Sequence, residues 1–398
     1  MSAKVSGAME KDILTIKLEG RVDSTNAPEL EKEIFDLCEK NPGVKVVVDA
    51  ENLEYISSAG LRVLLKLKKE RKDVEVINVS NDVYEIFEVT GFVDIMKIRR
   101  RLRQFSVDGC KMIGRGGFGK VYRYDPETII KVYRPEVQMD YIERERECSS
   151  IAFKNGLPTA IAFDVIRVGD SYGVMYELMD ADNLSSVIQS NPEQEDEYVR
   201  KYAELAKIIH HTKMEKGSLQ PASEMFRSSM APMGRWLSEE EIRHYDEMIN
   251  VIPERDTLIH GDFHEKNILV RGGELEMIDM GDISQGHPLV ELGCIYSSHL
   301  VFAEKVVDMP AEKGKEIWEK FLKYYFGDLK EETRKRLDRV MVWVAAMRRL
   351  PFLCMSLDPE TASHLGFVID KAKEEAFIDP ESIKEDFAVL DKELFSEN

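Results

Sequence analysis

The sequence has few cysteines and no long apolar run, and both absences narrow the class of protein. Its five cysteines are an odd number, widely scattered and without a C-x-x-C pair: Cys38, Cys110, Cys148, Cys294 and Cys354. This pattern does not suggest zinc binding or redox chemistry, and it predicts ordinary reduced thiols. No stretch of about 18 apolar residues is present, and the N-terminal segment MSAKVSGAMEKD lacks the apolar core of a signal peptide. We therefore expect a cytoplasmic protein without a membrane partner.

Positive charge is also scarce. The chain of 398 residues carries 55 Lys and Arg against 74 Asp and Glu, which gives a net charge of −19. Such a surface repels a phosphate backbone and argues against a general nucleic-acid binder. A cationic substrate fits this charge better, although solubility alone is the more common reason for it. Composition therefore does not name a substrate.

The chain has no low-complexity run and no internal repeat, and a length of 398 residues exceeds what one core usually organises. Residues 1–98 alternate strand-like segments (ILTIKL, VKVVVD) with helical ones (APELEKEIFDLCEK, SAGLRVLLKLKKE), which predicts an α/β domain. A glycine-rich hairpin and strands follow over residues 106–182, and mainly helical segments over residues 183–398. In this helical part, EIWEKFLKYYFG has apolar residues at helical spacing, so we expect Trp318 and Phe321 in a core.

A basic cluster, RRRLRQF, separates the two patterns. Its arginines are Arg99, Arg100, Arg101 and Arg103. The cluster could bind an acidic face or an anionic ligand, but charge runs between domains are most often solvated. We assign residues 99–105 to a linker.

The segment IGRGGFGKVYR opens the second pattern with closely spaced glycines. They are Gly114, Gly116, Gly117 and Gly119, followed by Val121. The G-x-G-x-x-G spacing alone is weak evidence, because dinucleotide-binding folds use it before a helix. Here KVYRYD returns as a strand, and ETIIKVY adds another that carries Lys131 among apolar neighbours. In kinases this order lets the hairpin amides cover the phosphates of ATP while the lysine neutralises them.

A lysine in this role is held by a carboxylate. The helical segment YIERERECSSIAF offers Glu143, Glu145 and Glu147, at least two of which must lie on a solvated face. We favour Glu145 as the partner of Lys131.

The segments HGDFHEKNIL and MIDMGD carry the chemical groups of the second half. DTLIHGD runs an apolar strand into a polar loop, so Asp262 is placed to accept the proton of a substrate hydroxyl. Asn267 offers an amide oxygen to Mg²⁺, and Asp279, at the end of a hairpin formed by NILV and ELEMID, suits a direct Mg²⁺ ligand. His260 and His264 are four residues apart, but that spacing favours zinc only on a helix, so we expect structural hydrogen bonds from them.

HGDFHEKN, IDMGD and GHPLVELG together resemble the aminoglycoside phosphotransferase and choline kinase-like group of protein-kinase-fold enzymes, over roughly residues 106–300. The resemblance implies an α+β bilobal kinase-like domain with a helical C-terminal substrate subdomain, which uses ATP and Mg²⁺. It also implies Asp262 as the catalytic base, Asn267 and Asp279 as metal ligands, and Lys131 on the phosphates.

The resemblance leaves the phosphate acceptor open. Members of the group phosphorylate aminoglycosides, choline, sugars, amino acids and, in distant relatives, proteins, and a fold does not settle function. The helices around residues 195–250 are implied to shape the acceptor pocket. This chain carries Glu291 in GHPLVELG where the family commonly has an aspartate, and we expect this difference to have a small effect.

LEGRVDSTNAPELEKEI and VVVDAENLEYISSAGLRVLL resemble a STAS domain of the anti-sigma-factor antagonists, over about residues 4–98. In that family a partner kinase phosphorylates a serine at the start of a helix, and a phosphate there interacts favourably with the helix dipole. Ser58 is the candidate phosphoacceptor and Ser57 the second, although many relatives have the modified serine directly before glycine, where this chain has Ala59. Helix capping without phosphorylation is the alternative for both serines.

Three hypotheses for function follow. The first is a Mg-ATP-dependent phosphotransferase acting on a small-molecule hydroxyl, with the STAS domain for regulation or for binding an anti-sigma-type signalling protein. The second is a kinase that phosphorylates a serine of a STAS domain. The third is a signalling adaptor that binds nucleotide without catalysis. Every expected catalytic position is filled, which favours an enzyme.

Overall fold

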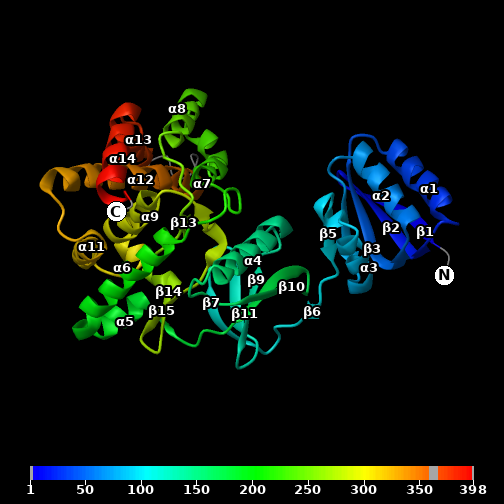
Figure 1. Cartoon of the computed structure of the whole chain (residues 1–398), viewed down its shortest axis with the longest axis horizontal. Coiled ribbons are helices and arrows are strands. Elements are labelled where there is room, and N and C mark those ends of the chain that lie inside the picture. The colour runs from blue at the N-terminus through cyan, green and yellow to red at the C-terminus, as the bar shows by residue number, and fades with distance from the viewer. Residues whose placement is uncertain (1–2, 358–365, 397–398) are drawn as a thin grey trace. The chain divides into compact units, whose positions relative to one another are not determined.

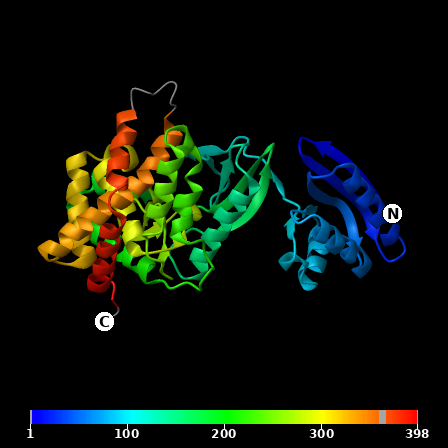
Figure 2. The same ribbon diagram turned by 90° about the horizontal axis from the view of Figure 1, so that it is seen from above.

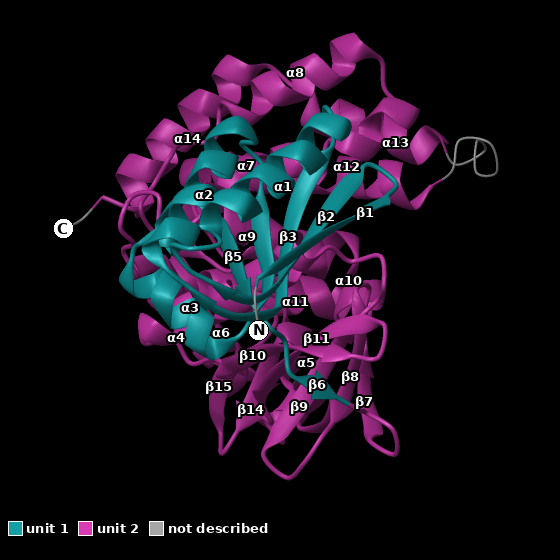
Figure 3. Cartoon of the chain, turned by 90° about the vertical axis from the view of Figure 1, so that its right-hand side faces the viewer, with its two compact units in different colours: residues 1–105 teal, residues 106–398 magenta. Residues whose placement is uncertain are grey.

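The computed structural model describes residues 3–357 and 366–396. The chain divides into two compact units, Met1–Phe105 and Ser106–Asn398, which are coloured separately in Figure 3. Each unit has its own cluster of buried hydrophobic residues.

The first unit is a five-stranded sheet in the order β1-β2-β3-β4-β5, with helices in the crossovers (Figure 1). Strands β2 to β5 are parallel to one another and β1 is antiparallel to β2. The strands are β1 (Lys4–Glu10), β2 (Ile13–Val22), β3 (Lys45–Ile56), β4 (Glu75–Val79) and β5 (Lys97–Arg100), and the helices are α1 (Ala27–Lys40), α2 (Ser58–Glu70) and α3 (Asn81–Val89). The two predicted helices of this domain are α1 and α2, which have the predicted bounds.

Alternating polarity explains how this sheet packs. Leu14, Ile16, Leu18 and Val22 of β2 are buried, while the residues between them are more exposed, so one face of the sheet is covered. In α1 the buried residues Leu30, Ile34 and Cys38 recur every four positions and supply the matching helix face.

The basic cluster is only partly a linker. Arg99 and Arg100 lie in β5, and the short strand β6 is Gln104–Phe105, so the prediction that residues 99–105 form a linker is wrong for these four residues. The Arg99 guanidinium lies 3.7 Å from the Glu75 carboxylate, and that of Arg100 lies 3.9 Å from the Glu88 carboxylate. These arginines balance acidic groups of their own unit, a long-range pairing that the local sequence does not reveal.

The second unit begins with an antiparallel sheet in which the strands run in the order β10-β11-β9-β8-β7. These are β7 (Lys111–Arg115), β8 (Gly119–Arg123), β9 (Thr128–Tyr133), β10 (Ala162–Val168) and β11 (Ser171–Glu177), with helix α4 (Met139–Lys154) between β9 and β10. Shorter strands follow: β12 (Asp182–Asn183), β13 (Leu258–Ile259), β14 (Ile268–Arg271), β15 (Glu274–Met277) and β16 (Ser284–Gln285).

The rest of this unit is helical, and Figure 2 shows these helices gathered on the side away from the antiparallel sheet. They are α5 (Leu184–Ser190), α6 (Glu195–His211), α7 (Ala222–Ser228), α8 (Glu239–Ile249), α9 (Pro288–Tyr296), α10 (Ala303–Val306), α11 (Ala311–Phe326), α12 (Glu331–Ser356), α13 (Gly366–Ala376) and α14 (Pro380–Leu394). The predicted bilobal α+β fold is confirmed, and Trp318 and Phe321 are fully buried as predicted. Among the described residues, no helix combines the length and apolar character that crossing a bilayer requires.

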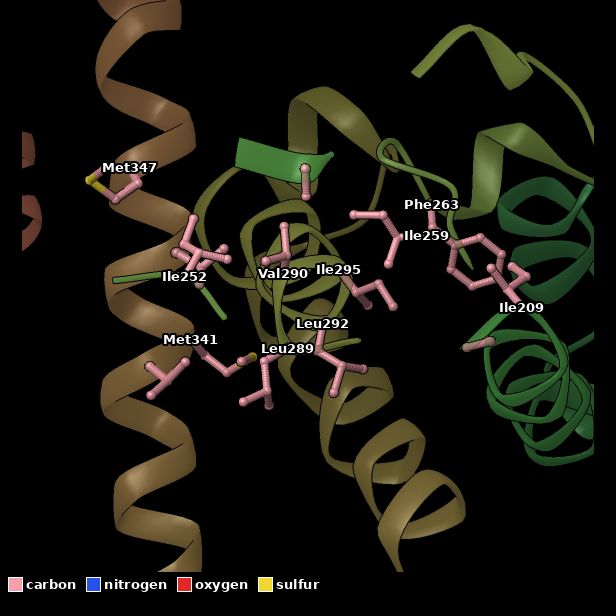
Figure 4. Packing of buried hydrophobic residues seen from close by; sticks show 14 of the residues in the cluster. Ile209, Ile252, Ile259, Phe263, Leu289, Val290, Leu292, Ile295, Met341 and Met347 are labelled. Atoms are coloured by element: carbon pink, nitrogen blue, oxygen red, sulfur yellow. The ribbon is translucent and has the colours of Figure 1, made fainter. Parts of the chain in front are cut away.

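The core of the second unit fixes the loop that follows β13. Ile259 and Phe263, on either side of the polar residues of this loop, are fully buried in the same cluster as Leu292 of α9 and Met341 of α12 (Figure 4). Helix α9 packs closely on α12 at Gly293. A Cβ atom there would lie only 2.4 Å from a methyl carbon of Val344. The loop is therefore held at both ends by apolar anchors.

Candidate active site

A cavity of about 360 Å³ lies beside the hairpin formed by β7 and β8. Its lining contains every residue predicted to bind the nucleotide, and also one predicted metal ligand: Gly114, Gly116, Gly117, Gly119, Val121, Lys131, Glu145 and Asp279. Asp262 and Asn267 are not part of this lining. The cavity continues to the end of β11, where Leu178 and Met179 line it.

Glycine is required at two kinds of position in the hairpin, for different structural reasons. A Cβ atom on Gly119 would lie 2.1 Å from the carbonyl oxygen of Val132 in β9, so only glycine permits this strand pairing. A Cβ atom on Gly116 or Gly117 would meet nothing within 4 Å, and the Gly116 amide donates to the Gly119 carbonyl at 3.0 Å. These two glycines leave the turn backbone open to a ligand.

Lys131 joins two carboxylates across the cavity. Its Nζ lies 2.6 Å from Oε1 of Glu145 and 3.0 Å from Oδ1 of Asp279. Glu145, on α4, is only 2% exposed and also accepts a hydrogen bond from the hydroxyl of Tyr176 at 3.2 Å. Burial alone would lower the pKa of Lys131, but the two carboxylates raise it above its ordinary value. The ammonium group is therefore charged, and Lys131 lines the cavity.

Asp262 and Asn267 are brought together in the loop after β13. The Asn267 amide nitrogen donates to Oδ2 of Asp262 at 3.1 Å and to its backbone carbonyl at 3.0 Å. His264 places Nε2 at 3.4 Å from the same carboxylate. Burial would raise the pKa of Asp262, but the contact with His264, together with the charge of Arg348, holds it well below its usual range.

Asp279 follows the hairpin of β14 and β15, whose end is linked to the loop that carries Asn267. The amide of Ile278 donates to the carbonyl of Asn267 at 2.9 Å, so the backbone of Asn267 lies beside the residue before Asp279. Asp279 has φ of 61°, a left-handed conformation that non-glycine residues rarely adopt. The surrounding structure therefore holds this carboxylate in position against its backbone preference.

This donor set fits a magnesium ion. Mg²⁺ is usually held by one or two carboxylates and completes its shell with water and substrate phosphates. Asp279, whose side chain is 49% exposed, and the neighbouring Asn267 amide supply this kind of set. The described residues contain no group of three or more His, Cys, Asp and Glu side chains arranged for a metal, so a cage made by protein alone is not the pattern here.

Two charged residues that the sequence does not identify as part of the site, the buried Glu291 and the half-buried Arg348, hold the loop after β13. The Glu291 carboxylate of α9 accepts hydrogen bonds from the amides of His260 and Gly261, and Arg348 of α12 donates to the Gly261 carbonyl at 2.5 Å. The structural hydrogen bonds predicted for His260 are present: its Nδ1 accepts from the Asp262 amide at 3.3 Å. Nothing in the local pattern around Arg348 points to this loop.

In the first unit the two candidate serines differ in exposure. Ser57 occupies the N-cap position of α2, but its side chain makes no capping hydrogen bond, and its buried hydroxyl has no partner among the described residues. Ser58, the first residue of α2, is exposed. The alternative in which the Ser57 hydroxyl caps the helix is therefore wrong.

Together, the glycine hairpin, the Lys131–Glu145 pair and the carboxylates around the cavity define a protein-kinase-like phosphotransferase that is joined to an α/β unit of the STAS type. The chain belongs to the phosphotransferase enzyme family, whose sequence profile matches residues 115–336, and a STAS domain profile matches residues 8–105. Both resemblances drawn from the sequence are confirmed.

Known proteins match the two units separately. A Bordetella bronchiseptica protein described as a putative anti-sigma factor antagonist, BtrV, is 39% identical over 85 residues, which are 20% of this chain and 72% of that protein. The anti-sigma-B factor antagonist of Listeria monocytogenes is 26% identical over 94 residues, 23% of this chain and 82% of its own. Amicoumacin kinase hAmiN, solved with AMP-PNP and Ca²⁺, is similar in fold at 14% identity and a TM-score of 0.50, over 73% of this chain and 92% of its own.

Proposed function

We propose that this protein is a Mg-ATP-dependent phosphotransferase that transfers the γ-phosphate of ATP to a hydroxyl group of a small molecule. One observation carries the proposal: a single cavity is lined by the glycine hairpin, the Lys131–Glu145 pair and Asp279. Asp262 and Asn267 are hydrogen-bonded to each other, and the backbone of Asn267 is bonded to that of Ile278, the residue before Asp279.

Each residue has a role that its surroundings support. The amides of the hairpin and the ammonium group of Lys131 would bind the phosphates, and Glu145 would orient Lys131. Asp279 and Asn267 would hold Mg²⁺, which neutralises phosphate charge when it is bound. In the transfer, the acceptor oxygen bonds to the γ-phosphorus as the bond to the bridging oxygen breaks, Asp262 receives the hydroxyl proton, and ADP leaves.

The STAS unit supports a regulatory role. Its relatives carry the name of anti-sigma factor antagonists, which favours a signalling protein as its partner. Exposed Ser58 is the proposed site of modification, and the less accessible Ser57 is the second. The exposure of Ser58 also supports the second candidate function, in which the phosphate acceptor is a serine of a STAS domain.

The test is to incubate the purified chain with Mg-ATP and a panel of amines, sugars and isolated STAS protein, and to locate the phosphate by mass spectrometry. A phosphorylated small molecule, formed by the wild type and not by Asp262→Asn or Asp279→Ala, is expected. Phosphoserine at position 57 or 58 would instead favour the protein acceptor. Transfer at the wild-type rate by either variant would contradict the role assigned to that residue.

A further inference from the structure

The peptide units on both sides of Gly261 are held by charged side chains from two helices. Oε1 of Glu291, on α9, accepts from the Gly261 amide at 3.2 Å, and Nη1 of Arg348, on α12, donates to the Gly261 carbonyl at 2.5 Å. Gly261 has φ of +85°, and a Cβ atom there would lie 2.4 Å from the carbonyl oxygen of Asp282. The backbone directly before Asp262 therefore has little room to move.

Arg348 is also the cation among three carboxylates. Burial acts to lower its pKa, but Cys294 and the carboxylates of Asp262, Asp282 and Glu291 raise it. Of these acids Glu291 is buried, Asp262 is half-buried and Asp282 is exposed. Removing the arginine would leave the buried Glu291 carboxylate without this compensating charge. Arg348 thus touches the loop through one carbonyl and balances the charge of the acids around it.

We propose that Arg348 is a positioning residue for phosphoryl transfer, which holds the Gly261–Asp262 peptide so that the Asp262 carboxylate meets the acceptor hydroxyl. This inference rests on the proposed function of Asp262. Arg348 acts through the backbone of Gly261 and belongs to α12, far along the chain from the loop. A displacement of the reacting groups of about 1 Å can cost on the order of 100-fold in rate, so a single backbone hydrogen bond at this point matters.

The neighbouring Arg349 provides a matched control. It lies on the same helix and is similarly shielded, but it forms an ion pair with Glu375 of α13 instead of bonding to the loop. Arg348→Met and Arg349→Met therefore remove the same charge and leave the same side chain on one helix. Only the first removes a contact with the catalytic loop.

The experiment compares hydrogen exchange in peptides covering residues 258–268, the affinity for the ATP analogue AMP-PNP with Mg²⁺, and the steady-state constants with the acceptor that the panel of amines, sugars and STAS protein identifies. For Arg348→Met we expect faster exchange in the loop and a kcat lower by on the order of 100-fold, with the KM for ATP within about threefold of the wild type. Arg349→Met should leave loop exchange and kcat unchanged, even where it lowers the melting temperature.

Arg348→Lys keeps the positive charge but loses the fixed fork of the guanidinium. It therefore tests the positioning role of Arg348 if Arg348→Met does not fold. We expect an intermediate kcat and intermediate loop exchange for this variant. Wild-type loop exchange in the folded Arg348 variants, or an equal loss of kcat in Arg349→Met, would overturn the proposal. If the wild type phosphorylates no acceptor, the proposed function fails, while loop exchange still tests whether Arg348 holds the loop.

Discussion

At the scale of single residues, Asp262 is a weak base by environment. Its pKa lies well below the ordinary range, since the hydrogen bond from His264 and the charge of Arg348 outweigh the effect of burial. The carboxyl group is therefore ionised, and in the proposed transfer it can orient the acceptor hydroxyl before it receives the proton. This agrees with a phosphoryl transfer in which the protein chiefly positions groups and stabilises charge.

The first prediction concerns this carboxylate. Asp262→Asn keeps the shape of the side chain but removes its ability to accept a proton, so the transfer rate should fall by about 10²- to 10⁴-fold. Steady-state kinetics with the identified acceptor measures this, with the melting temperature as a check on folding. Asp328→Asn, at an exposed side chain just after α11, is the matched control and should keep the wild-type rate.

A second prediction concerns His287, whose side chain is fully buried beside Asp391. Burial lowers its pKa from 6.5 to about 4, although Asp391 opposes this. The unfolded chain therefore binds a proton between these values that the folded chain does not. The contribution of neutral His287 to the free energy of unfolding is fully present above about pH 6.5. It is lost progressively as the pH falls towards 4, which lowers the free energy of unfolding by up to about 3 kcal/mol.

His287→Asn tests this, because asparagine keeps a side chain that can accept the amide hydrogen of Leu289 but does not titrate. The free energy of unfolding, measured by urea denaturation, should fall less steeply from pH 6.5 to 4 in this variant. Equal slopes in the two proteins would refute the assignment.

At the scale of elements, the glycine hairpin combines a structural and a ligand-binding requirement. Gly119→Ala forces a Cβ atom against the Val132 carbonyl, so we expect β8 and β9 to separate locally and the unit to lose stability. Gly116→Ala meets no atom of the protein, so it should keep the melting temperature but weaken nucleotide binding by about tenfold through contact with the phosphates. Calorimetric titration with AMP-PNP and thermal unfolding separate the two effects. The prediction fails if the two variants behave alike.

Elements also mark the limit of what the sequence could predict. The bounds of α1 and α2 and the hairpin at Gly116 follow from local spacing, because apolar periodicity and turn residues act over a few positions. Local spacing offers three glutamates as partners of Lys131, and the structure confirms the favoured Glu145. Arg348 could not be found in this way. Its place beside Gly261 depends on how α12 packs on α9, which no local pattern encodes.

At the scale of the whole molecule, each unit has its own buried core, so the units should unfold separately. Scanning calorimetry of the full chain should show two transitions. Mg-AMP-PNP at about 100 times its Kd should stabilise the kinase-like unit by about 2.7 kcal/mol and shift only that transition. A single transition that shifts as a whole with nucleotide would contradict independent folding.

The left-handed backbone of Asp279 implies that activity and stability favour different residues at this position. Glycine would adopt this conformation without strain, so Asp279→Gly should relax the backbone while deleting the carboxylate that we propose as a Mg²⁺ ligand. A screen that selects only for thermal stability would thus favour glycine at this position, in variants that have lost activity. Retaining an aspartate here is therefore a signature of selection for activity.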